Sequence, residues 1–147
     1  MANTSKASAK WAGALETGKG TINADTSGLF TDAPYDFKAR LEGSNSIVSP
    51  EELLGAAHAA CFSMAFSLVL GQEKGIAPKS IETRAEVTFD VTDAGPAITG
   101  IKLINKSWID GLTEAEFQEI ANVVKENCPV SKALKGVDIT LEATLVA

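Results

Sequence analysis

The sequence predicts an α+β protein, with antiparallel strands and helices in separate stretches of the chain. Two observations support this. Short segments alternate apolar and polar residues, as half-buried strands do, and two longer segments begin with helix-capping motifs. The expected order is β-β-β-α-β-β-α-β, in which helices are segregated from an antiparallel sheet. With 147 residues, 45% of them hydrophobic, we predict a single domain over residues 1–147.

The N-terminal part is predicted to form three short strands. Residues 8–28, SAKWAGALETGKGTINADTSG, contain two strands joined around Gly18 and Gly20, because glycine favours turns. DFKARLEG, residues 36–43, is expected to be the third strand, and the polar loop SNSIV follows it. These strands would precede the most apolar segment of the chain.

That apolar segment, residues 49–71 (SPEELLGAAHAACFSMAFSLVLG), predicts a long helix. Ser49 and Glu52 form a capping box, Pro50 suits the first helical position, and Gly71 supplies a stop. Residues 53–70 carry no formal charge, which approaches the length of a membrane span. We reject a membrane span because the polar side chains of His58, Ser63 and Ser67 interrupt the segment. Strands are also expected on both sides of it.

A helix that is apolar on all sides is expected to be buried on all sides. One small domain can hardly cover such a helix completely, and its many alanines allow another helix to approach closely. We therefore predict a homodimer in which a second subunit completes the burial.

The C-terminal half is predicted to be strand, strand, helix, helical turn and strand. Residues 81–91 alternate, residues 98–109 follow a turn, and residues 137–147 close the chain as another strand. Thr113 and Glu116 form a second capping box, and the helix ends near Cys128–Pro129 because proline disfavours a helical residue before it. One face of the first strand carries Ile81, Thr83, Ala85, Val87, Phe89 and Val91.

Composition limits the function classes. A formal charge of −6 argues against nucleic acid or an anionic membrane as partner. We see no signal-peptide pattern, so a cytoplasmic location with reduced thiols is expected. Two cysteines are too few for a disulfide framework or a four-ligand zinc site. They are either two inert core thiols or a redox pair.

The first candidate group lies on the apolar helix. Cys61 alone is more often a small buried hydrophobe than a nucleophile. His58, three positions earlier, could be a base or a ligand, although a lone histidine there is more often a hydrogen-bonded core residue. Glu51 has no place in the capping box and could simply stabilise the helix N-terminus. It lies ten residues before Cys61, roughly 15 Å along a helix, so the two cannot touch within one helix.

Cys128 and Arg40 are the remaining candidates. Cys128 lies where one helix is expected to stop and a short one to start, and helical N–H groups there would lower the pKa of its thiol. It is 67 positions from Cys61 (128 − 61), so local reasoning leaves their pairing open. Arg40 and Arg84 are the only arginines. Arg40 could stabilise a thiolate and bind a substrate oxygen, or lie on the surface, whereas Arg84 is expected to be solvated.

Longer motifs carry a resemblance to a known family. SPEELLGAAHAACFSMAFSL and NCPVSKAL, together with AKWAGALETGKGTINADTSG, PYDFKARLEG, DAGPAITGIKL and VDITLEATL, resemble the OsmC family, which is related to organic hydroperoxide resistance proteins. The match covers nearly the whole chain. The histidine in GAAHAACF resembles the OsmC branch, since the sister branch typically has tyrosine there.

The resemblance implies a thiol-dependent peroxidase that reduces organic hydroperoxides. Cys61 matches the peroxidatic cysteine, Cys128 the resolving cysteine, Arg40 the arginine that holds the thiolate, and Glu51 the carboxylate that pairs with this arginine. The implied architecture is an intertwined homodimer with sheets wrapped around central helices. No cofactor or metal is implied, only an external dithiol reductant, for which the family suggests a lipoyl type.

Three other interpretations stay open. A non-enzymatic redox sensor of oxidative or osmotic stress would use the same two cysteines. A metal site could be built from Cys61, His58 and Cys128. Alternatively, both thiols could be buried and inert.

Overall fold

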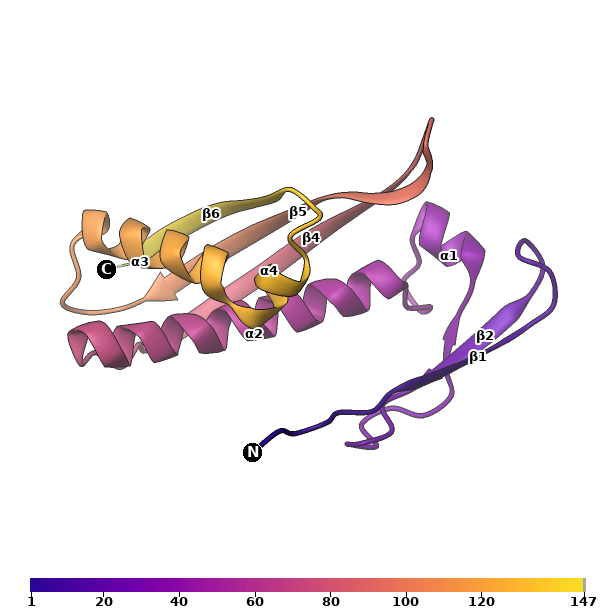
Figure 1. Ribbon diagram of the computed structural model, residues 1–147, viewed down its shortest axis with the longest axis horizontal. Helices are drawn as coiled ribbons and strands as arrows, with labels where there is room; N and C mark the ends of the chain where they lie inside the picture. Colours follow the sequence, from indigo (N-terminus) through magenta and orange to yellow (C-terminus); the bar gives the residue numbers. More distant parts are fainter. Residues whose placement is uncertain (147) are drawn as a thin grey trace. The chain divides into compact units, whose positions relative to one another are not determined.

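The computed structural model describes residues 1–146, which form two compact units, 1–50 and 51–146 (Figure 1). Each unit is described by itself below. The single domain expected over residues 1–147 stays a prediction.

The first unit contains a three-stranded antiparallel sheet of β1 (Ser8–Ala12), β2 (Lys19–Asn23) and β3 (Ala33–Tyr35), in that order. The two predicted strands around Gly18 are thus confirmed. Gly20 lies within β2 and not in the turn, opposite both Trp11 and Tyr35. A Cβ at this position would overlap the Tyr35 ring, so glycine is needed where the two aromatic residues face one another.

The strand predicted over residues 36–43 is wrong, because the segment forms a helix, α1 (Phe37–Glu42). Its N-cap is Asp36, whose carboxylate accepts a hydrogen bond of 2.8 Å from the Ala39 N–H. Lys19 Nζ lies 2.6 Å from the same carboxylate. The helix ends at Gly43, which adopts a positive φ of 76°. The short alternation in this segment was therefore outweighed by a capping signal at its first residue.

The long helix α2 (Pro50–Lys74) begins at the predicted residue but ends later than Gly71. Gly75 takes the left-handed conformation, with φ 66°, and its N–H donates to the Gly71 carbonyl over 3.2 Å. This is the helix end typical of a glycine just after the last helical turn. Gly71 lies on an open surface inside the helix, where glycine is tolerated.

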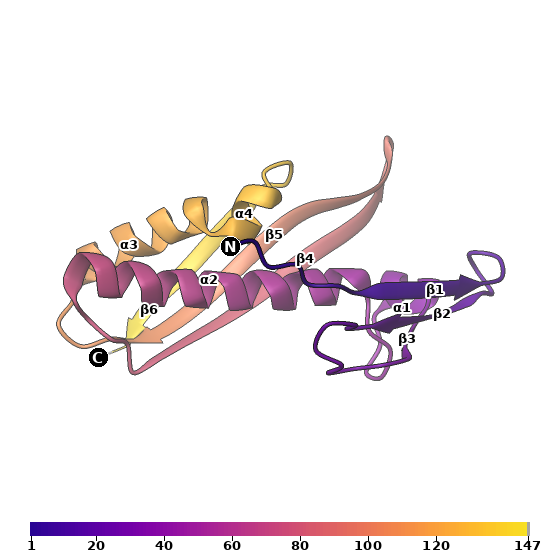
Figure 2. The same ribbon diagram turned by 60° about the horizontal axis from the view of Figure 1, so that its bottom comes forward.

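The second unit also contains a three-stranded sheet, in the order β4 (Ser80–Thr92), β5 (Gly95–Trp108) and β6 (Ile139–Val146). The first two strands form the expected antiparallel hairpin. The pairing of β5 with β6 is parallel, unlike the all-antiparallel sheet that we predicted. The reason is the connection through α3 (Glu114–Asn127) and α4 (Pro129–Ala133), which returns the chain to the starting end of β5 (Figure 2).

Helices α2 and α3 cover the same face of this sheet (Figures 1 and 2). Phenylalanine rings fill the space between the two helices. The Phe66 and Phe117 ring centroids lie 5.5 Å apart, and those of Phe62 and Phe66 lie 5.9 Å apart. At the N-terminal half of α2 the helix approaches β4 closely, since a Cβ on Gly55 would stand 3.3 Å from the Ala85 carbonyl oxygen. The core thus lies between α2, α3 and the sheet.

The predicted inward face of β4 is confirmed for its first half. Ile81, Ala85 and Val87 pack against the core, whereas Val91 is 61% exposed. A β-bulge between Thr88 and Phe89 shifts the register, and Val91 lies beyond it near the hairpin tip.

The capping box of α3 predicts an acid-dependent contribution to stability. Glu116 accepts hydrogen bonds from the Thr113 N–H (3.0 Å) and from Lys74 Nζ (2.7 Å), which lower the pKa of its carboxyl from 4.5 to about 2. A lowered folded-state pKa stabilises the fold above the unfolded-state pKa, and this contribution is lost as pH falls through the folded-state pKa. Glu116→Gln should therefore be less stable than wild type at pH 7, and urea midpoints should converge between about pH 4.5 and 2. A difference in urea midpoint between the two proteins that stays constant across this pH range would contradict the expectation.

Candidate redox site

The structure brings Cys61 and Cys128 into contact. The Cys128 Sγ lies 3.2 Å from the Cys61 Sγ, and both cysteines are free thiols. Because the S–S bond of a disulfide is about 2.05 Å long, closure needs a side-chain movement of only about 1 Å. The two positions are 67 residues apart in sequence, and the pairing that local reasoning left open is made by the fold.

The two sulfur atoms are held by different local structures. Cys61 lies in the middle of α2 and is half-buried. Cys128 caps both neighbouring helices: its N–H donates to the Val124 carbonyl at the end of α3 (2.9 Å), and Pro129 starts α4 directly after it. It is 1% exposed. The helix end predicted at Cys128–Pro129 is confirmed, and the resulting turn places Cys128 against α2.

The surroundings of the two thiols shift their pKa values in opposite directions. Burial raises the pKa of Cys61, and the neighbouring Cys128 thiol adds to this. Burial would also raise the pKa of Cys128, but the amide and hydroxyl of Ser131, the Cys61 thiol and the Val130 amide together lower it. Amides at a helix start favour a thiolate, as we predicted for Cys128. The local surroundings therefore favour the thiolate form at Cys128 and disfavour it at Cys61.

His58 lies one turn before Cys61 on α2 and is completely buried. Its Nε2 is 2.7 Å from the Ser131 hydroxyl, which confirms the interpretation of a hydrogen-bonded core histidine. Burial lowers the pKa of the imidazole, which favours the neutral form of the ring. Ser131 is a residue that sequence reasoning missed. The signal was available in CPVS, because a serine three residues after a helix-capping cysteine lies about one turn further along the helix.

Glu51 and Arg40 lie in places where the structure does not test their roles. Glu51 is buried, at 6% exposure, in the first turn of α2, ten residues before Cys61 on the same helix. Arg40 lies in the last turn of α1, in the first unit, while both cysteines lie in the second. It lines a pocket of about 230 Å³ together with the aromatic residues Trp11, Tyr35 and Phe37. Their action at the thiol pair stays a prediction.

The metal site considered from sequence does not form in the described part of the chain. Within residues 1–146, no three histidine, cysteine, aspartate or glutamate side chains come close enough to hold a metal ion. His58 instead directs its Nε2 to the hydroxyl of Ser131.

Fold and site together define a small α+β protein in which two helices hold a pair of thiols in contact. The sequence matches the OsmC-like protein family over residues 43–142, more than half of the chain. The chain belongs to the OsmC family.

Individual relatives agree with this assignment. The chain is 47% identical to the Peroxiredoxin OsmC of Escherichia coli (strain K12) over 140 residues. This aligned region covers 95% of each chain. It is 33% identical over 137 residues to the organic hydroperoxide resistance protein OhrB of Bacillus subtilis (strain 168), covering 88% of this chain and 98% of that one. The crystal structure of the Bacillus subtilis OhrB matches with a TM-score of 0.72 and 29% identity, covering 97% and 98% of the two chains.

Helix α2 is long enough and apolar enough to cross a membrane, judged by length and composition alone. Phe62, Phe66 and Leu70 are fully buried against the sheet and α3, and His58 is buried on the same helix. We interpret α2 as a core helix and the protein as soluble.

Proposed function

We propose that the protein is a thiol-dependent peroxidase that reduces organic hydroperoxides, and hydrogen peroxide more weakly, to the alcohol or water. The observation that carries this proposal is the 3.2 Å contact between the sulfur atoms of Cys61, on α2, and Cys128, at the junction of α3 and α4. Relatives with the names peroxiredoxin and organic hydroperoxide resistance protein support peroxides as the oxidant.

In the first step, the Cys61 thiolate attacks the terminal oxygen of the hydroperoxide. The S–O bond forms as the O–O bond breaks, and the alkoxide leaves and takes up a proton to become the alcohol. Cys61 is left as a sulfenic acid, the first stage of cysteine oxidation.

Cys128 then attacks the oxidised Cys61 sulfur, forming a disulfide and releasing water. This step protects Cys61 from further oxidation to the sulfinic acid. An external dithiol, of a lipoyl or similar type, reduces the disulfide by exchange and returns both thiols. No cofactor or metal takes part.

Arg40 and Glu51 complete the proposed site. Burial raises the pKa of the Cys61 thiol, and a guanidinium beside it would favour the thiolate. Arg40, from this chain or its partner, is the proposed source, and its donors also orient the peroxide oxygens. Glu51 would pair with Arg40 and position it while Cys61 is reduced.

The apolar surroundings of Cys61 support a preference for organic substrates. Cys61 lies within residues 53–70 of α2, which carry no formal charge and are mostly apolar. An alkyl or aryl group gains free energy by leaving water for such a site.

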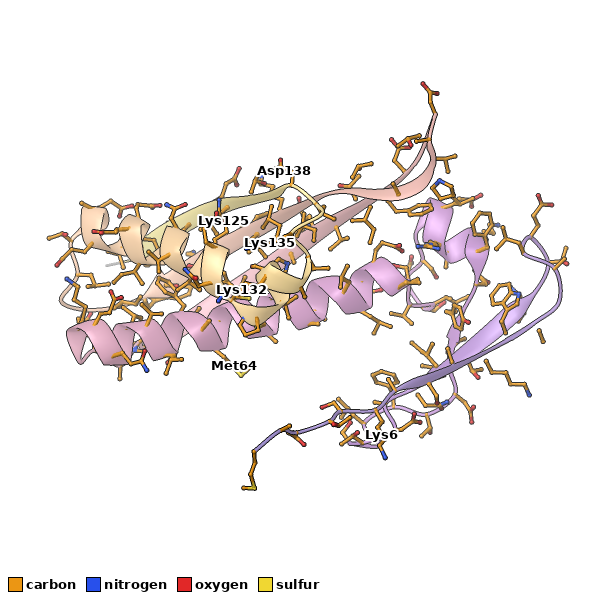
Figure 3. The ribbon with its side chains drawn as sticks, viewed as in Figure 1. Lys6, Met64, Lys125, Lys132, Lys135 and Asp138 are labelled. Carbon is orange, nitrogen blue, oxygen red and sulfur yellow. The ribbon has the colours of Figure 1, made fainter. Side chains whose placement is uncertain are left out.

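A homodimer is supported by an open apolar stripe on α2. Ala57, Ala60, Met64 and Leu68 follow helical spacing and are exposed, with Met64 at 68% and Leu68 at 59%. Figure 3 shows Met64 pointing away from α3 and α4. Isolated apolar side chains on a surface need no explanation, but a continuous stripe indicates a partner. We propose that the partner is the same stripe of a second chain.

Replacing Met64 with glutamate is therefore expected to produce monomers, because a charge would be buried at the centre of the interface. Light scattering at micromolar concentration should give wild type a mass near twice the 15.3 kDa of one chain. Val123→Glu, at an exposed apolar position of α3, is the matched control and should remain dimeric. A wild-type protein with the mass of one chain would contradict the proposed dimer.

The other partners follow from the proposed chemistry. They are a small hydrophobic hydroperoxide and a dithiol reductant, with neither nucleic acid nor membrane, in keeping with the net charge of −6. A reducing cytoplasm is the proposed location, since the cycle starts from two thiols.

Steady-state consumption of cumene hydroperoxide and of hydrogen peroxide, with excess dihydrolipoamide, tests the proposal. The expected result is many turnovers, faster with cumene hydroperoxide. Reaction of a single equivalent that then stops would instead identify a redox sensor, and no reaction would identify inert thiols.

A further inference from the structure

His58 is a buried titratable side chain that the proposed peroxidase cycle does not use. Its exposed fraction is 0%, and its Nε2 lies 2.7 Å from Ser131 Oγ. Its other ring nitrogen, Nδ1, is buried and has no hydrogen-bond partner within the described residues. Ser131 is itself buried, at 3% exposure.

The unpaired Nδ1 indicates which nitrogen carries the proton of the neutral ring. If Nδ1 were protonated, a buried N–H donor would be left without an acceptor, which is rare in folded proteins. With the proton on Nε2, only an acceptor lone pair is unmatched. In that tautomer Nε2–H donates to Ser131 Oγ, and the single hydroxyl proton of Ser131 is free to point elsewhere.

Cys128 is the neighbour toward which this hydroxyl can point. Cys128 is the N-cap of α4 and Ser131 is the third residue after it, so the two residues lie about one turn apart at the start of the helix, within reach of one another. The Ser131 hydroxyl is among the groups that lower the pKa of Cys128. His58 thus contacts Ser131, Ser131 stands three residues after Cys128 at the start of α4, and Cys128 Sγ lies 3.2 Å from Cys61 Sγ.

We propose that His58 is a positioning residue for the resolving step: it turns the Ser131 hydroxyl toward Cys128 Sγ and so keeps Cys128 ready as the nucleophile. The inference rests on the proposed peroxidase function. Cys128 attacks as the thiolate, its lone pair forms the S–S bond with oxidised Cys61, and the S–O bond pair leaves as hydroxide, which takes a proton to become water. Ser131 gives a hydrogen bond throughout and transfers no proton.

The titratable surroundings of Cys128 include groups from several elements. Cys61 faces it from α2, and His58, also on α2, contacts Ser131. Lys125 and Glu126 on α3, and Lys135 and Asp138 after α4, line a polar pocket together with Ser131. Figure 3 shows Lys125, Lys132, Lys135 and Asp138 gathered around α4. Variants at His58 and Ser131 leave these charges in place, so differences among the variants report the His58–Ser131 contact.

The test measures the Cys128 thiolate by its ultraviolet absorbance across pH, in a Cys61→Ser background where it is the only thiol. His58→Phe and Ser131→Ala should raise the Cys128 pKa, giving an about tenfold lower thiolate fraction at pH values below it. His58→Gln places an N–H donor near the Nε2 position and should titrate like the parent. The measurement needs no peroxide, so it can be read even if the proposed peroxidase activity fails.

A kinetic measurement follows the same variants with Cys61 present. After a single equivalent of cumene hydroperoxide, disulfide formation should be about tenfold slower at neutral pH in His58→Phe and Ser131→Ala, and should recover at high pH. Unchanged Cys128 titration in the folded Ser131→Ala protein would overturn the inference. So would a His58→Gln variant that behaves like His58→Phe, since packing alone would then explain the effect. If His58→Phe fails to fold, Ser131→Ala and His58→Gln decide the question.

Discussion

Cys61→Ser is expected to reduce hydroperoxide consumption to the rate of the reductant alone. Serine fills the same space but is a far weaker nucleophile than a thiolate at neutral pH. Cys128→Ser should behave differently, because Cys61 can still react once. It should consume one fast equivalent of cumene hydroperoxide and then, with a second equivalent, gain the mass of a sulfinic acid.

The two serine variants form a matched pair, since each removes one thiol of a contact that is 3.2 Å long in the wild type. Stopped-flow kinetics and intact-mass measurements read both outcomes. The pair also tests the order of attack, because Cys128 is the thiol with the lowered pKa in the second unit. If Cys128→Ser no longer consumed the first equivalent of cumene hydroperoxide and Cys61→Ser still did, Cys128 would be the peroxidatic residue.

Arg40→Met is expected to slow the first oxidation step by roughly 10² to 10³, the usual cost of removing a donor that stabilises developing charge. Loss of the guanidinium should raise the pKa of Cys61 further, so the pH–rate profile should move to higher pH. The second-order rate constant for reaction with cumene hydroperoxide, measured across pH in single-turnover experiments, reports both effects.

Arg84→Met is the natural control, because Arg84 is the only other arginine and lies exposed on β4, paired with Glu86 at 2.7 Å. It should react at the wild-type rate. Equal rates for the two arginine variants would exclude Arg40 from the site. Glu51→Ala should also be slower than wild type, and a rate near that of wild type would count against its pairing with Arg40.

Local signals in the sequence were enough to predict most elements. The capping box of Thr113 and Glu116 is present in full, and α2 begins at Pro50 as expected. The errors lie where two local signals compete. DFKARLEG alternates weakly but begins with a capping aspartate, and two glycines compete to end α2, of which Gly75 adopts the left-handed conformation.

Long-range features were beyond such reasoning. The parallel direction of β6 depends on the route through α3 and α4 and not on its own alternating pattern. The contact between Cys61 and Cys128 likewise depends on how α2 packs against the α3–α4 junction. The family resemblance identified both cysteines as site residues, but it did not identify Ser131. The position of Ser131 at the site is shown only by its hydrogen bond with His58.

The most direct test of the central claim, that Cys61 and Cys128 are one redox couple, is to identify the product of a single oxidation. Reduced wild-type protein would be treated with one equivalent of cumene hydroperoxide, alkylated with iodoacetamide and mapped by peptide mass without reduction. We expect a disulfide between Cys61 and Cys128 of the same chain, with neither thiol alkylated. Two alkylated thiols, or a disulfide that links two chains, would contradict the claim.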